Sequence, residues 1–218
     1  MWLTLDKSCE HAASTDAELQ RRLAEVKALA DPIQGWVDDV SGSLLYRLAR
    51  FYSPLPSTVE LGSWKGRSTI WLASALRDRG AGKLYAIDTW MGSPGQAAYG
   101  ELLQGYGEGH LFFEFQANIS RAGLSDVVVP MRSTTIDAAY SEDVPREIGL
   151  LFIDADHEYE AVLRDFEAWS PKVVHGGLIV FDDVPSWPGP TRLIPQLPGW
   201  YEQVGATWNQ CVLRKATR

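Results

Sequence analysis

The chain has 218 residues, which corresponds to about one globular domain. Hydrophobic residues make up 45% and charged residues 22%, proportions that favour a packed core over intrinsic disorder. The 20 Lys and Arg against 28 Asp and Glu give a net charge of −8, which argues against binding to nucleic acids or to an anionic membrane face.

The first 16 residues, MWLTLDKSCEHAASTD, contain neither the apolar segment nor the cleavage pattern of a signal peptide. No run approaches the roughly 18 apolar residues of a membrane-spanning helix. The two cysteines, Cys9 and Cys211, are too few for a disulfide scaffold, so we expect reduced thiols in a cytoplasmic protein.

Apolar periodicity predicts helices over residues 16–30 and 43–52. Residues 57–78 follow as a short apolar run, a glycine-containing turn and a helical pattern, and residues 83–88 form the next strand, which completes a βαβ unit. Residues 89–110 contain six glycines, and a glycine-rich segment of this length favours an active-site loop.

The second half of the chain continues to alternate strands with helices. The expected elements are a helix at 111–122, strands at 126–131, 149–156 and 176–184, helices at 136–143 and 158–169, a proline-rich loop at 185–199 and two closing strands at 200–205 and 208–215. This order predicts an α/β fold with a mainly parallel sheet and an antiparallel hairpin at one edge. We expect residues 1–35 to be a helical appendage and 36–218 to be a single domain.

Ligands of parallel sheets bind beyond the carboxyl ends of the strands. After the first central strand, Gly62 and Gly66 allow a ligand to approach the backbone, and the following helix amides favour a carboxylate or phosphate. Asp88 ends the next strand, where a carboxylate can accept both hydroxyls of a ribose. Trp64 and Trp90 follow strand ends and can wall a pocket. The alternative is that Gly62 and Gly66 only form a tight strand-to-helix turn and that Asp88 caps a loop. Neither standard nucleotide-binding glycine motif is present.

The late strands deliver Asp154, Asp182 and Asp183 to the same edge of the sheet. Converging carboxylates repel one another unless their pKa values rise or a cation is present, and Mg²⁺ with oxygen ligands is the simplest cation. His157 can serve as a general base, because histidine is the side chain whose unperturbed pKa lies near the working pH, and a structural histidine is the alternative. Asp156 precedes a helix, which it can alternatively cap.

Three segments together carry a resemblance to a known family: VELGSWKGRSTIWLA, YAIDTWMG and LFIDADHEYEAVLRDFEAWSPKVVHGGLIVFDDV. They resemble the class I S-adenosylmethionine-dependent methyltransferases, and among these the metal-dependent O-methyltransferases related to macrocin O-methyltransferase, which modify sugars on natural products. The resemblance covers about residues 35–215. It implies a Rossmann-like α/β fold with helices on both faces of a mainly parallel, seven-stranded sheet whose last strand is antiparallel.

The resemblance also implies roles for individual residues. Glu60, Gly62, Ser63 and Gly66 would contact the methionine part of the cofactor, Asp88 the ribose and Ser133 the adenine. The full expected cofactor set is Glu60, Gly62, Ser63, Gly66, Ser68, Asp88, Trp90, Ser133 and Asp154. The expected metal ligands are Asp154, Asp182 and Asp183. Relatives use either the carboxylate matching Asp156 or the histidine matching His157 as the base, and this chain has both.

The sequence therefore predicts an S-adenosylmethionine-dependent O-methyltransferase, assisted by Mg²⁺ or another divalent cation, that acts on a hydroxyl of a sugar or glycosylated small molecule. The catechol-type branch has a lysine where this chain has Asp156, which disfavours a catechol. Three alternatives remain: a phenolic or polyketide acceptor, a metal-dependent D-x-D glycosyltransferase, and an inactive adenosylmethionine-binding protein. The resemblance further implies a homodimer or larger homo-oligomer.

Overall fold

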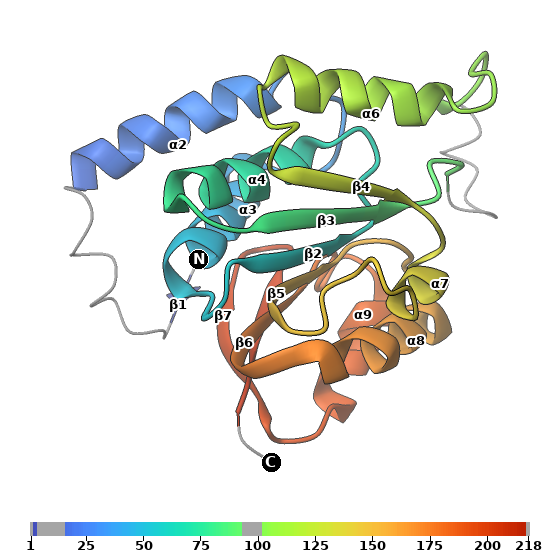
Figure 1. Ribbon diagram of the computed structural model, residues 1–218. Coiled ribbons are helices and arrows are strands. Elements are labelled where there is room, and N and C mark those ends of the chain that lie inside the picture. The colour runs from blue at the N-terminus through green and yellow to red at the C-terminus, as the bar shows by residue number, and fades with distance from the viewer. Residues whose placement is uncertain (1, 4–15, 93–101, 217–218) are drawn as a thin grey trace.

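A central eight-stranded sheet organises the computed structural model, which describes residues 2–3, 16–92 and 102–216 (Figure 1). The strands are β1 (Trp2–Leu3), β2 (Ser57–Leu61), β3 (Lys83–Asp88), β4 (Val128–Arg132), β5 (Ile148–Ile153), β6 (Val173–Phe181), β7 (Tyr201–Ala206) and β8 (Cys211–Lys215). Their order is β1-β7-β8-β6-β5-β2-β3-β4, with parallel pairing from β6 through β4. β8 lies antiparallel to both β6 and β7, so the predicted fold class is confirmed.

One strand was not expected from the sequence. The two residues of β1 pair antiparallel with Gly205 and Ala206 of β7 and extend the sheet from seven strands to eight. Two residues carry no periodic pattern, and this strand exists because the outer edge of β7 offers unpaired backbone groups.

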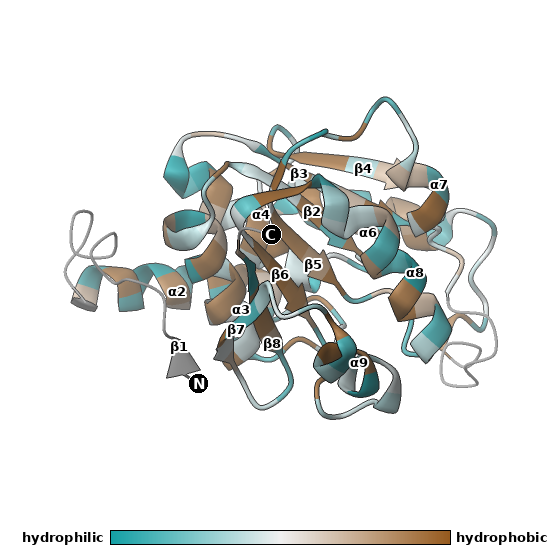
Figure 2. Cartoon of the chain, turned by 90° about the horizontal axis from the view of Figure 1, so that it is seen from below, coloured by the Kyte–Doolittle hydropathy of each residue, from teal (hydrophilic) through white to brown (hydrophobic). Residues whose placement is uncertain are grey.

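Helices cover both faces of the sheet (Figure 1). They are α2 (Asp16–Ala30), α3 (Asp39–Arg47) with a π-helical turn at Leu48–Tyr52, α4 (Arg67–Arg79), α6 (His110–Arg121), α7 (Thr135–Ala139), α8 (Tyr159–Trp169) and α9 (Pro188–Leu193). The first four pack on one face, and α7, α8 and α9 pack on the other. Apolar colour is concentrated on the strands between these layers (Figure 2).

Alternation along the strands divides the interior into two cores. In β5, Leu150 and Phe152 face the core beneath α2, α3, α4 and α6, whereas Leu151 and Ile153 face the core beneath α8. All four side chains are nearly inaccessible, as expected for a strand that is covered on both faces. The parallel strands therefore place successive residues at their ends on defined sides of the sheet.

Several predicted boundaries differ from the observed ones: the strands expected at 149–156 and 176–184 are β5 and β6, which end at Ile153 and Phe181, and the helix expected at 136–143 is α7, which ends at Ala139. Two further differences have identifiable reasons. The proline-rich segment 185–199 is not all loop, because it contains α9 and a 3₁₀ turn at Ile194–Gln196. Pro188 begins α9, where proline costs no helical hydrogen bond. The helix expected at 43–52 begins earlier, because the Asp38 side chain accepts hydrogen bonds from the N–H groups of Val40 and Ser41.

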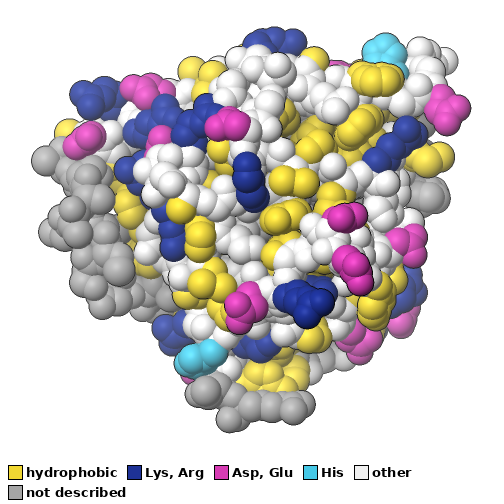
Figure 3. Space-filling view, in the orientation of Figure 1, with side chains coloured by type: hydrophobic (Ala, Val, Ile, Leu, Met, Phe, Trp, Pro, Cys, Tyr) yellow, Lys and Arg dark blue, Asp and Glu magenta, His cyan; other side chains and the backbone are white. Residues whose placement is uncertain are grey.

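The surface carries acidic and basic side chains side by side, as Figure 3 shows for one face. Across the described ranges, no helix is long and apolar enough to cross a bilayer. Cys211 is a free, buried thiol whose pKa is raised by burial to about 11. Cys9 and residues 93–101 of the expected active-site loop lie outside the described residues.

Candidate active site

The three strands β2, β5 and β6 end level with one another, because Leu61 pairs with Ile153 and Ile153 with Phe181. The next residues extend the ladder: Asp154 donates its N–H to the Leu61 carbonyl (2.9 Å), and Asp182 donates to the Ile153 carbonyl (3.1 Å). Strand order reverses between β2 and β5, the position at which open α/β sheets bind their ligands.

A cavity of about 440 Å³ opens at this edge of the sheet. It brings together ten of the thirteen predicted site residues, namely Gly62, Ser63, Ser68, Asp88, Ser133, Asp154, Asp156, His157, Asp182 and Asp183. Glu60, Gly66 and Trp90 do not line it. The wall also contains side chains that sequence reasoning missed, among them Trp36, Thr135, Ile136, Arg164, Asp165 and Trp187.

The two predicted glycines have different structural tasks. Gly62 has φ of +85°, and a Cβ there would lie 2.1 Å from the Asp154 carbonyl oxygen, so the backbone of this loop lies directly against the end of β5. Gly66 has φ of +94° at the start of α4, and its Cβ would approach Phe115 and Ile119 of α6. Gly62 therefore belongs to the cavity, whereas Gly66 sets the packing behind it.

Asp88 connects the loops that follow β2 and β3. Its Oδ2 accepts the N–H groups of Ser63 (2.9 Å) and Trp64 (2.8 Å), and its Oδ1 accepts the N–H of Trp90 (2.7 Å). A carboxylate offers about four acceptor positions, so capacity remains for a ligand hydroxyl. The side chain is thus fixed in place by the protein before any ribose is bound.

Trp90 does not wall the cavity as the sequence suggested. Its ring is 3% exposed and packs against Phe112 and Phe115 of α6, with centroid distances of 4.7 and 4.8 Å. Its Nε1–H donates to the Trp64 carbonyl (2.7 Å), which satisfies the buried indole. Trp90 has a left-handed backbone conformation, with φ of +51°, and its ring lies in the core instead of at the strand end.

Glu60 lies behind the cavity wall and is fully buried. Its Oε2 accepts the hydroxyls of Ser63 (2.7 Å) and Thr69 (2.6 Å), while its Oε1 is buried with no partner among the described residues. Burial raises the pKa of Glu60 to about 7, although the neighbouring hydroxyls lower it. The structure places Ser63, which lines the cavity, next to this carboxyl group.

We expect wild-type protein to lose stability relative to Glu60→Gln as the pH rises from about 4.5 to about 7. The folded pKa is above the unfolded one, so the folded protein keeps a proton that the unfolded chain has released. The effect has an upper limit of about 3.5 kcal/mol, because each pKa unit corresponds to about 1.4 kcal/mol. Urea denaturation of both proteins between pH 4 and 8 measures it, and a pH-independent difference contradicts it.

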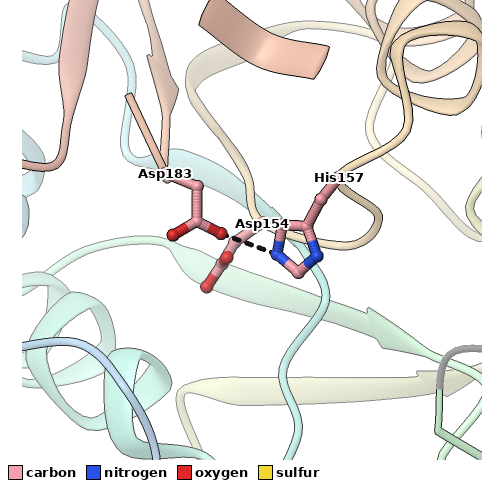
Figure 4. A group of neighbouring side chains, drawn as sticks. All are labelled: Asp154, His157 and Asp183. Atoms are coloured by element: carbon pink, nitrogen blue, oxygen red, sulfur yellow. Dashed lines mark ion pairs between the residues drawn. The ribbon is translucent and has the colours of Figure 1, made fainter. Parts of the chain in front are cut away.

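Asp154, His157 and Asp183 form a compact group beside the glycine loop (Figure 4). Their ligand atoms lie within 4.8 Å of one another, and His157 Nε2 lies 2.6 Å from Asp183 Oδ2. Asp183 Oδ1 accepts a hydrogen bond from Asn209 Nδ2 (3.1 Å). Burial and the charges of Asp182 and Asp183 raise the pKa of Asp154, which shows how closely the acids are crowded.

Asp182, the third predicted metal ligand, lies next to this group but is not part of it. It is 7% exposed, and its Oδ1 is buried without a hydrogen-bond partner in the described chain. Burial and the charge of Asp183 raise its pKa. Unpartnered buried carboxylate oxygen among crowded acids fits a hard divalent cation, which uses oxygen ligands and offsets their repulsion.

The two candidate bases differ in their surroundings. Asp156 Oδ1 accepts the N–H of Glu158 (2.9 Å) at the start of α8, so this carboxylate also shapes the turn. His157 pairs with Asp183 and stacks on Trp187, with ring centroids 4.5 Å apart and planes at 17°. The structure therefore orients the histidine from two sides.

The missed wall residues differ in how visible they are in the sequence. Trp187 lies in the segment interpreted as a proline-rich loop and carried no signal. Asp165 shares the buried face of α8 with Val162, Phe166 and Trp169, so an acid at a core position was a signal that could have been noticed.

Residues 59–184 match a protein family described as "Methyltransferase domain". The fold is similar to that of SAH-bound methyltransferase PaMTH1 from Podospora anserina (TM-score 0.62, 15% identity, 98% of each chain) and an O-methyltransferase from Bacillus cereus in complex with SAH (TM-score 0.58, 21% identity, 98% of each chain). Uncharacterized protein R132 of Acanthamoeba polyphaga mimivirus is 32% identical over 78 residues, which are 36% of this chain and 31% of that protein. The chain thus matches about a third of the length of this curated relative.

Proposed function

The chain belongs to the methyltransferase-domain family, and we propose that it transfers a methyl group from S-adenosylmethionine to a hydroxyl oxygen of a sugar or glycosylated small molecule. One observation carries the proposal: a single cavity joins the glycine loop after β2 and Asp88 to the Asp154–His157–Asp183 group. The first part suits the cofactor and the second part suits an acceptor hydroxyl. The glycosyltransferase alternative does not fit the family to which the chain belongs.

For the cofactor, we assign the methionine part to Gly62 and Ser63, the ribose to Asp88 and the adenine to the side of Ser133. The close approach of Gly62 to β5 and the hydrogen bonds that fix Asp88 support this assignment. The cofactor carries a cationic sulfonium, and an acid-rich cavity attracts it. Glu60 and Gly66 support the loop from behind, at the positions described above.

We assign a divalent cation, most simply Mg²⁺, to Asp154, Asp182 and Asp183, and when bound it lowers the pKa of a coordinated hydroxyl. The acceptor oxygen attacks the sulfonium methyl in line, a new C–O bond forms, and the C–S bond breaks with its electron pair left on sulfur. His157 takes the hydroxyl proton, while Asp183 holds its Nε2–H and so favours the tautomer in which Nδ1 accepts. Asp156 is the alternative base.

A saccharide acceptor is supported by three features. Neighbouring hydroxyls of a sugar can both approach a cation, as a vicinal diol does. Trp187 lines the cavity at 39% exposure and offers an aromatic surface for an apolar sugar face. The cavity holds six aspartates, which disfavours an anionic acceptor.

The proposal is tested by a methyl-transfer screen with tritiated S-adenosylmethionine over diol-containing glycosides, phenols and polyketides, with and without EDTA. We expect product from a glycoside and loss of product in EDTA. Cofactor binding without product from any acceptor would favour an inactive binding protein, and product only from phenols or polyketides would favour that acceptor class. The cytoplasmic location and homo-oligomeric state remain predictions, and gel filtration tests the second.

Replacing Trp187 with alanine is expected to raise the acceptor KM by about 3- to 10-fold, the range of one aromatic packing contact. The value of kcat should also fall, because the same ring stacks on His157 and helps to orient it, so the rise in KM is the readout that reports the acceptor contact. Steady-state kinetics with the best glycoside measures both. Trp208→Ala is the matched control, since this tryptophan is 60% exposed and donates to Asp38 outside the cavity wall. Equal effects of both variants would contradict the assignment.

A further inference from the structure

A buried carboxylate outside the metal group lies on the wall of the same cavity. Asp165 is 3% exposed and occupies the buried face of α8, yet it lines the cavity together with Thr135 and Ile136. An apolar side chain is the usual occupant of such a position on an amphipathic helix. An acid there needs a reason beyond helix packing.

The protein holds this carboxylate in one orientation. The Thr135 hydroxyl donates a hydrogen bond to Asp165 Oδ1, and the Thr135 carbonyl accepts the Nε1–H of Trp169 (2.9 Å). These bonds join α7 to α8, which lie side by side (Figure 1). A carboxylate has about four acceptor positions, so Asp165 can accept further hydrogen bonds from a ligand at the cavity wall.

Burial of Asp165 is costly in the protein as it stands. Burial raises its pKa to about 6, and the hydroxyl of Thr135 and the charge of Arg164 lower it only in part. A buried carboxylate with one neutral donor is incompletely compensated. A ligand that brings an N–H donor to this wall would supply the missing hydrogen bond, whereas a ligand oxygen would be repelled.

We propose that Asp165 accepts a hydrogen bond from the exocyclic amino group of the cofactor's adenine and thereby selects a 6-amino purine over a 6-oxo purine. The inference rests on the proposed function, since it needs the adenosyl cofactor in the cavity with its adenine beside Ser133. Ile136 and Ala161 supply apolar wall next to Asp165, as a flat ring requires. Asp165 is then a specificity residue that touches the cofactor far from the reacting methyl group.

The experiment compares two ligands by calorimetry at pH 7.5: S-adenosylhomocysteine and its 6-oxo analogue, S-inosylhomocysteine. Wild-type protein is expected to bind the 6-amino ligand about 10- to 100-fold more tightly, the range of a hydrogen bond to a charged group. In Asp165→Asn, the preference should fall below about threefold, because an amide can donate to an oxo group as well as accept. Glu167→Gln, an exposed neighbour on α8, should keep the wild-type preference.

Thr135→Val provides a second variant that leaves Asp165 in place and removes the hydroxyl that orients it. A preference reduced in this variant, with circular dichroism unchanged, supports the proposal even if Asp165→Asn does not fold. Equal wild-type affinities for the two ligands, or an undiminished preference in Asp165→Asn, would overturn the inference while leaving the proposed function intact. Failure of wild-type protein to bind S-adenosylhomocysteine would overturn both.

Discussion

Asp182→Ala is expected to lower the rate of methyl transfer by about 10³-fold or more, because a bound cation supplies several kcal/mol of charge stabilisation. Divalent-cation affinity should fall with it, while binding of the adenosyl cofactor largely survives. The physical reason is the buried Oδ1 of Asp182, which has no hydrogen-bond partner within the described residues and which would be a ligand of the cation. Calorimetric titration of Mg²⁺ and of S-adenosylhomocysteine into the variant measures the two affinities separately.

Asp182→Asn keeps the shape of the side chain and separates loss of the charge from a packing defect. Glu142→Gln removes an exposed acid elsewhere and should leave both affinities unchanged. Unchanged Mg²⁺ affinity in both Asp182 variants would rule out this residue as a ligand. In that case the compact group of Asp154, His157 and Asp183 becomes the better candidate for a metal site.

His157→Ala is expected to lower kcat by about 10²- to 10⁴-fold, the usual contribution of a positioned acid-base group. The histidine is held by Asp183 at 2.6 Å and by the ring of Trp187, so its removal takes away an oriented proton acceptor. Metal and cofactor affinities should change little. Single-turnover methyl transfer, followed across pH, separates the proton-transfer step from binding.

His175→Ala is the matched control, because this histidine is exposed in the first part of β6, away from the carboxyl end of the strand. A loss of less than threefold in His157→Ala would move the role of base to Asp156, and Asp156→Asn should then carry the large effect. A large loss of Mg²⁺ affinity in His157→Ala would instead identify the histidine as a metal ligand.

The strongest sequence signals were regular apolar patterns in elements that bury one face or both faces. The helix at 16–30 and the strand at 83–88 were predicted with their observed bounds, because the buried residues of the helix recur at helical spacing and the strand is a short apolar run whose side chains alternate between the two cores. The prediction of a loop for the proline-rich segment was wrong, because a proline that begins a helix cannot be told in a sequence from a proline that interrupts one. The two-residue β1 lies below the length at which any pattern exists.

In the candidate site, too, some features could be predicted from the sequence and others could not. Parallel strands deliver their ends to one edge, so residues directly after a strand, such as Asp154 and Asp182, could be placed together from the sequence. Side-chain direction beyond the strand could not be predicted. Trp90 follows β3 but turns into the core, while Trp187 comes from a distant segment and reaches His157. Tertiary packing decides these directions, and no local pattern encodes them.

Two glycines set a limit on how this site can be altered. Gly62 presses against the main chain of Asp154, and a Cβ on Gly189 would lie 2.0 Å from the carbonyl oxygen of His157. The loop after β5 is therefore in close backbone contact with the loop after β2 through Gly62 and with the start of α9 through Gly189. A chimera that replaces the loop after β5 alone with one of a different backbone path would meet the main chain at Gly62 or Gly189, so we expect this loop to be exchangeable only together with the segments that contact it.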